Sequence, residues 1–144
     1  MKAWVCKSGF GSVQEMLGAV GRAAKESGIE VAVVSREALE GAGEGRLLLA
    51  EHLSTSGRIK RERMAHSAAN EFLLWLACER QVSVAIAKVG ATDAKEFGIV
   101  AIGKGSSTEF VAYLKKSGIE CKEAKFKVKD DLKELERMAV SRIE

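Results

Sequence analysis

The chain of 144 residues contains no proline, and only 6% of its residues are aromatic. Its three cysteines, Cys6, Cys78 and Cys121, lie far apart in the sequence and form no C-x-x-C pair. This spacing argues against a zinc site and against a thioredoxin-like redox motif, so we expect reduced, mostly buried thiols. The net charge is only +3, which by itself does not indicate a nucleic-acid partner.

Long apolar runs are absent as well. Runs such as residues 72–78 are much shorter than the ~20 residues that a membrane-spanning helix needs. The first residues also lack the apolar stretch of a secretory signal peptide, so we expect a cytoplasmic protein that contacts no membrane. A hydrophobic fraction of 47% with 30% charged residues is typical of a folded chain. The length predicts one domain over residues 1–144.

Local patterns predict strands interleaved with helices. Apolar and β-branched runs predict strands at residues 3–6, 29–34 and 97–102. A looser alternation of apolar residues with charged residues, mostly lysines, predicts an edge strand at residues 121–128. Helices are expected at residues 13–27, 36–53 with a glycine-marked break, and from about residue 58 to residue 78. Further helices are expected at residues 82–89, 107–117 and 132–143.

The first of these helices has the clearest signals. Ser12 and Glu15 form a capping box, Gly28 stands where a left-handed cap would end the helix, and one apolar stripe follows helical spacing. That stripe consists of Val13, Met16, Leu17, Val20 and Ala24. The order of elements predicts an α+β fold: a mixed sheet of four to five strands, covered by helices, with a central all-helical block.

Two glycine motifs suggest nucleotide binding, and both have a simpler explanation. The Gly-Phe-Gly of residues 9–11 lies between a predicted strand and helix, but the third glycine of a dinucleotide fingerprint is replaced by Gln14. Residues 98–104 match the start of a P-loop by letter, yet Gly105 replaces the magnesium-binding Ser or Thr and the interior reads as a strand. We therefore interpret them as a turn into a capped helix and as a buried strand.

Other catalytic or metal-binding groupings are not evident. His52 and His66 lie in predicted helices without a partner at i+4, so surface or structurally satisfied histidines are favoured over a base or ligand pair. The acidic residues are scattered along predicted helix faces. The sequence therefore indicates no cofactor, no metal and no catalytic residue.

Two cationic features are more suggestive. One is a basic segment with four cations in six positions, which a phosphate backbone would attract, although a solvated helix start is an equal alternative. This basic segment consists of Arg58, Lys60, Arg61 and Arg63. The other is the pair Arg80 and Gln81 between two predicted helices, which could cap those helices, hold a phosphate or base edge, or do both.

The region around this pair resembles a known family. Residues 71–82 read EFLLWLACERQV and are followed by Ala85-Ile86 and by Val89-Gly90. This region resembles the small tRNA-binding, kinase-associated subunit of the KEOPS complex. The shared order is an acidic residue, a leucine-rich run, an Arg-Gln element, an Ala-Ile pair and a final Val-Gly pair. The resemblance is strongest over residues 47–103. The family's usual Ser-Gly before the Arg-Gln pair is here replaced by Ala-Cys-Glu at residues 77–79.

The resemblance implies a protein that catalyses no reaction itself. KEOPS installs the threonylcarbamoyl group on an adenosine of certain tRNAs, and the family binds the kinase-like ATPase subunit and recruits tRNA through its 3′ CCA end. The basic segment would then contact phosphates, while Arg80 and Gln81 would shape the pocket for the RNA end.

The apolar stripe of the last predicted helix is a candidate partner surface, although a core position is the stronger alternative. This stripe consists of Leu132, Leu135, Met138 and Ile143. Two rival functions stay open at this point: a small-molecule or nucleotide enzyme on the same sheet, and a self-associating structural domain.

Overall fold

The computed structural model describes residues 2–55, 68–102, 107–124 and 137. The strands are β1 (Ala3–Ser8), β2 (Glu30–Ser35), β3 (Glu96–Ile102) and β4 (Ile119–Glu123). The helices are α1 (Val13–Ser27), α2 (Arg36–Gly41), α3 (Glu44–Thr55), α4 (Ala68–Ala77), α5 (Val82–Val89) and α6 (Ser107–Lys116). The fold is therefore α+β, as predicted, with a helical block of α2 to α5 between β2 and β3.

The strands form one sheet in the order β2-β3-β1-β4, and all three pairings between neighbours are antiparallel. We expected a mixed sheet, so this part of the prediction is wrong for the described strands. The reason is that neither of the single-helix crossovers, α1 and α6, joins neighbouring strands, while the block of α2 to α5 joins the neighbours β2 and β3 in antiparallel orientation. Helix α1 leads from β1 to β2 with β3 between them, and α6 leads from β3 to β4 with β1 between them. Two such interlocked units make a ferredoxin-like, split β-α-β topology.

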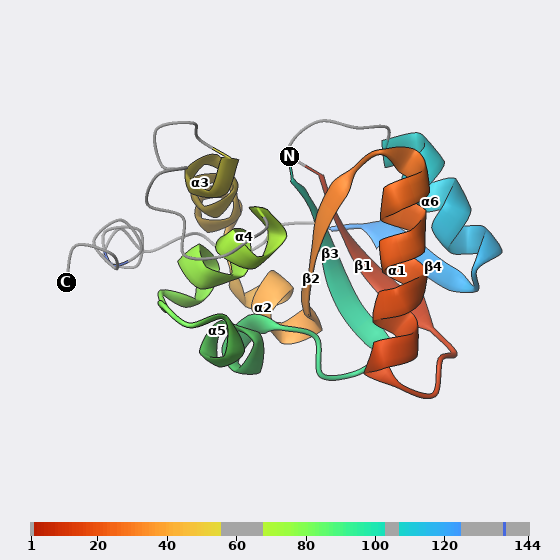
Figure 1. The fold of residues 1–144 in the computed structure, drawn as a ribbon, viewed down its shortest axis with the longest axis horizontal. Coiled ribbons are helices and arrows are strands. Elements are labelled where there is room, and N and C mark those ends of the chain that lie inside the picture. The colour runs from red at the N-terminus through yellow and green to blue at the C-terminus, as the bar shows by residue number, and fades with distance from the viewer. Residues whose placement is uncertain (1, 56–67, 103–106, 125–136, 138–144) are drawn as a thin grey trace.

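Helices cover both faces of the sheet (Figure 1). On one face α1 and α6 lie side by side and contact each other. Their core contains Met16, Phe110 and Leu114, and the Trp4 and Phe110 rings lie 5.7 Å apart. On the other face α4 contacts α3, α5 and β2, and its core includes Phe72, Leu74 and Leu76. None of the described helices has the length and apolar character to cross a bilayer.

The local signals of α1 are confirmed. The Ser12 hydroxyl accepts a hydrogen bond from the Glu15 amide at 3.1 Å, and Gly28 ends the helix in the left-handed conformation at φ 66°. Met16 and Val20 are buried, but Leu17 is 42% exposed, so its assignment to the buried stripe is wrong. Residues 16, 19, 20 and 23 face the sheet, and Leu17 lies at the side of that stripe.

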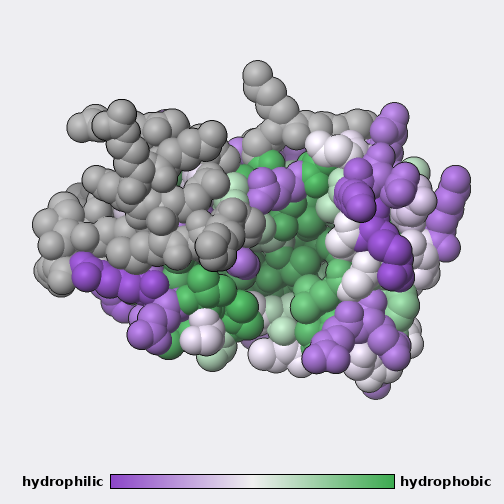
Figure 2. Space-filling model, in the orientation of Figure 1, coloured by the Kyte–Doolittle hydropathy of each residue, from purple (hydrophilic) through white to green (hydrophobic). Residues whose placement is uncertain are grey.

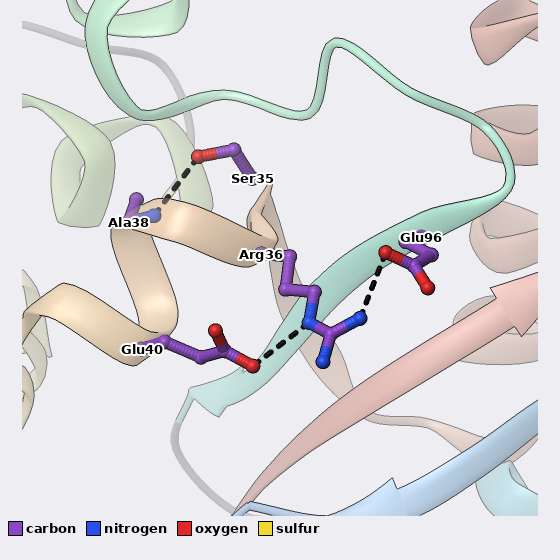
Figure 3. Close-up of polar contacts among 5 residues, drawn as sticks. All are labelled: Ser35, Arg36, Ala38, Glu40 and Glu96. Atoms are coloured by element: carbon purple, nitrogen blue, oxygen red, sulfur yellow. Dashed lines mark hydrogen bonds and ion pairs between the residues drawn. The ribbon is translucent and has the colours of Figure 1, made fainter.

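Helix α2 is held to the sheet by polar contacts (Figure 3). The Ser35 hydroxyl accepts from the Ala38 amide at 3.0 Å, which caps α2. Arg36 contacts Glu40 at 2.8 Å and Glu96 of β3 at 2.7 Å. The hydrogen bonds to Glu40 and then to Glu96 raise the pKa of Arg36 above its ordinary value. The guanidinium is partly exposed, so the contacts orient α2 more than they stabilise the fold.

The helical block is also tied to the edge of the sheet at the end of α5. Gly90 donates its amide to the Ile86 carbonyl at 2.8 Å and forms an isolated β-bridge with Val34 of β2. Figure 2 shows hydrophobic residues on the surface between α1 and the helical block, where β2 lies in Figure 1. In agreement, Val31 and Val33 of this edge strand are only half-buried.

The contact between α2 and β3 depends on the absence of a side chain at Gly98. A Cβ atom placed there would lie 2.7 Å from Leu39 Cδ2 and 3.1 Å from Val34 Cγ2, and both neighbours are buried. We predict that Gly98→Ala lowers the free energy of unfolding by about 1–3 kcal/mol because it overpacks this contact. Denaturant titration of the purified variant measures the change.

A matched glycine supplies the control. Gly21 lies on the exposed side of α1, and no neighbouring atom lies within 4 Å of the position that a Cβ atom would take there. Gly21→Ala is expected to raise the free energy of unfolding by about 0.5–1 kcal/mol, since alanine restricts the unfolded chain and favours a helix. Equal effects of the two substitutions would contradict the proposed packing at Gly98.

Candidate nucleic-acid interface

The candidate site lies where α4, the most buried of the described helices, reaches the surface. Every residue of α4 from Glu71 to Ala77 is buried, whereas the next four residues become progressively exposed. We call these four residues the α4–α5 corner: Cys78 and Glu79 are half-buried, and Arg80 and Gln81 are exposed. The corner therefore presents two polar side chains from a backbone that is anchored in the core.

A Schellman motif sets the direction of the chain at the corner. The Cys78 amide donates to the Trp75 carbonyl at 3.2 Å, and the Glu79 amide donates to the Leu74 carbonyl at 3.0 Å. This motif needs a left-handed residue after the helix, and Cys78 fills that position with φ 56°. Among the described residues it is the only non-glycine residue with a positive φ. Glycine is the usual residue there because it has no Cβ to clash with the backbone.

Charged side chains of α3 and α5 contact the corner and the last turn of α4. Glu79 forms an ion pair with Lys88 of α5 at 2.5 Å, which links the corner to the far end of that helix. Arg46 of α3 donates from Nη2 to the Leu76 carbonyl at 3.0 Å and so satisfies a carbonyl in the last turn of α4. These contacts fix both sides of the turn, and they leave the Arg80 and Gln81 side chains at the surface.

The amino-terminal end of α5 differs from the other helix starts. Gln81 is its N-cap residue and its carbonyl accepts from the Ala85 amide at 3.0 Å, but within the described residues its side chain makes no capping hydrogen bond. The first turn, residues 82–84, contains no acidic residue, whereas α1, α2, α4 and α6 each have a glutamate in the first turn. The partial positive charge at the start of α5 is therefore not offset by an acid of its own first turn.

The structure accounts for some of the predicted site residues. Arg80 and Gln81 are adjacent and exposed, as a ligand contact requires, but the expected cap by the Gln81 side chain is wrong. Arg46 makes a cationic contact to the end of α4 at the Leu76 carbonyl, and the contact that we expected from Arg80 stays a prediction. Sequence spacing could not reveal Arg46, because 30 residues separate it from Leu76.

The remaining predicted site residues lie outside the described part of the chain. They are the basic segment, Arg58, Lys60, Arg61 and Arg63, and the apolar stripe of Leu132, Leu135, Met138 and Ile143. His66 also lies outside it, and His52 is exposed on α3. Among the described residues, no three His, Cys, Asp or Glu side chains come together in a group that could hold a metal ion.

Both glycine motifs have the expected structure where the structure describes them, and residues 103–105 of the second lie outside the described part of the chain. Residues 9–11 form the connection into α1, whose first turn is capped by Ser12. Residues 98–102 belong to β3 and are completely or almost completely buried. Comparison of the chain with protein-family models and with curated proteins finds no match.

The left-handed conformation of Cys78 leads to a stability prediction. We expect Cys78→Gly to be more stable than Cys78→Ala by about 1 kcal/mol, because both remove the sulfur and only glycine relieves the steric cost of the positive φ. Thermal and denaturant unfolding of the two variants measure the difference. If alanine proves equal or better, the Schellman motif at the corner is incorrect.

Proposed function

We propose that the protein is a non-catalytic, cytoplasmic accessory subunit of a KEOPS complex that modifies tRNA. In this role it binds the kinase-like ATPase subunit and recruits tRNA through the single-stranded 3′ CCA end. The observation that carries the proposal is the exposed Arg80–Gln81 pair, which lies directly before the start of α5 and within the region that resembles the family.

The chemistry of the corner suits the end of a single-stranded RNA. A phosphate can accept from backbone amides in the first turn of α5 and from the Arg80 guanidinium, since helix N-termini and arginines both favour such anions. The Gln81 side chain carries both a donor and an acceptor, so it can read the edge of an unpaired base. The guanidinium plane of Arg80 can also stack on a base.

Two further parts of the proposal come from the sequence. The basic segment, Arg58, Lys60, Arg61 and Arg63, would contact tRNA phosphates and supply much of the salt-dependent affinity. The apolar stripe of Leu132, Leu135, Met138 and Ile143 would contact the kinase-like ATPase. No cofactor or metal takes part in the proposed role.

The first prediction tests the RNA end itself. We expect the protein to bind intact tRNA more tightly than the same tRNA lacking its terminal CCA, by at least about tenfold if two or more contacts of roughly 1 kcal/mol are lost. Fluorescence anisotropy with the two labelled tRNAs measures both dissociation constants. Equal affinity would refute recognition of the 3′ end, and no binding to either would refute a tRNA-binding role for the isolated subunit.

The second prediction tests the corner. Arg80→Ala is expected to weaken binding of intact tRNA and to reduce the slope of log affinity against log salt by about 1, as the loss of one phosphate contact requires. Gln81→Ala should weaken binding without changing that slope, because an amide carries no charge. Titrations at several salt concentrations measure both quantities.

Arg22→Ala is the matched control for the corner. Arg22 is an exposed cation on α1, which covers the other face of the sheet, so its removal changes the net charge equally without touching the corner. The control should bind like the unaltered protein. If Arg80→Ala and Arg22→Ala have the same effect, the corner is not part of the RNA site.

A further inference from the structure

Two cysteines that are distant in the sequence face each other across the sheet. Cys6 of β1 and Cys121 of β4 are directly paired, and their Sγ atoms lie 2.8 Å apart in a hydrogen bond. Both are free thiols in the structure. The third cysteine, Cys78, is in the α4–α5 corner and belongs to the other core.

The type of strand pairing favours a bond between them. The Ala124 amide donates to the carbonyl of Ala3, the residue opposite it in the continued register, which identifies Ala3 and Ala124 as a hydrogen-bonded pair. Pair types alternate along an antiparallel ladder, so Cys6 and Cys121 form a non-hydrogen-bonded pair. The Cα atoms of such pairs are about 4.5 Å apart, which is within the range that disulfides span.

The two thiols differ in access. Cys6 is completely buried, whereas Cys121 is half-buried on an edge strand. Cys121 also lines a surface pocket of about 310 Å³, together with Val111, Lys115, Ile119 and Glu120. One cation and one anion therefore line this pocket together with Cys121, the more exposed of the two paired cysteines. This pocket suits a small zwitterionic molecule.

We propose that Cys6 and Cys121 form a thiol–disulfide exchange site whose substrates are low-molecular-weight peptide disulfides. In the first step the Cys121 thiolate attacks one sulfur of the peptide disulfide, whose S–S bond breaks. A mixed disulfide forms at Cys121, and the departing peptide thiolate takes up the proton that Cys121 released.

In the second step Cys6 loses its proton and attacks Sγ of Cys121. The mixed disulfide breaks, the second peptide thiolate leaves and takes up the Cys6 proton, and a Cys6–Cys121 disulfide remains. Two electrons pass from the protein thiols to the peptide disulfide, which is reduced to two thiols. The protein is left with β1 and β4 covalently joined.

The environment of Cys6 is consistent with this order of steps. The hydrogen bond with Cys121, burial and the charge of Cys121 raise the pKa of Cys6 above its ordinary value, so Cys6 stays protonated in the reduced protein. Once Cys121 is in a mixed disulfide, it can neither hydrogen-bond as a thiol nor carry charge. The hydrogen bond with Cys121 and the charge of Cys121, two of the three causes that raise the pKa of Cys6, are then removed. Cys6 therefore becomes a better nucleophile for the second step.

Incubation with oxidised glutathione tests the proposal, with intact mass spectrometry and thiol counting under denaturing conditions. The Cys78→Ser protein leaves only the two paired thiols; it should lose both and retain no glutathione. Adding Cys6→Ser should trap one glutathione on Cys121, while adding Cys121→Ser should leave Cys6 unmodified in the folded protein. In the unaltered protein, digestion without reduction should yield one joined peptide that contains Cys6 and Cys121.

Three results would overturn the proposal, and none depends on the stability of a variant alone. The first is an unaltered protein that keeps all its thiols in oxidised glutathione. The second is a Cys78→Ser protein that retains glutathione as strongly as the Cys6→Ser form. The third is a digest in which the peptides with Cys6 and Cys121 stay separate. Circular dichroism of each variant establishes that it is folded before exposure.

Discussion

The fold depends on the need to cover both faces of β3. This strand lies in the interior of the sheet, and its alternate side chains enter two separate cores: Phe97 and Ile99 lie in one, and Val100 and Ile102 in the other. The split β-α-β units place α1 and α6 on one face only. Without further helices, the other face of the sheet would expose its apolar side chains to water. The inserted helices α2 to α5 cover that face and bury those side chains.

That requirement also explains where the candidate site lies. Helix α4 is the central helix of the inserted block, in contact with α3, α5 and β2, and it is buried along its whole length from Glu71. A helix enclosed in this way can expose polar groups to solvent only at its ends. The Schellman motif at Cys78 and the Arg46 contact to Leu76 fix that end, so Arg80 and Gln81 project from a rigid base.

Sequence reasoning succeeded where the physical cause is local. The Ser12 cap, the Gly28 cap and the break between α2 and α3 each depend on a few adjacent residues, and all three are present. It failed where the cause is distant. The insertion of β3 between β1 and β2, the Arg46 contact and the pairing of Cys6 with Cys121 all join residues from separate elements, which no local period can show. At Gln81 the predicted position was right and the predicted contact was wrong. The residue occupies the N-cap position of α5, but within the part of the chain that the structure describes its side chain makes no capping hydrogen bond.

The two proposed sites lie on opposite parts of the sheet. The α4–α5 corner belongs to helices that pack on β2, one edge strand, whereas Cys121 lies in β4, the other edge strand, next to α6. Strands β3 and β1 separate the two edges, and a bond between Cys6 and Cys121 would join residues that already face each other. Such a bond changes few distances in the folded state and mainly restricts the unfolded chain. Two sites are energetically coupled when both favour one of two conformations of a shared structural element. A disulfide between residues that already face each other creates no second conformation, so it does not couple the sites. Oxidation of the thiols should therefore stabilise the protein without altering the corner.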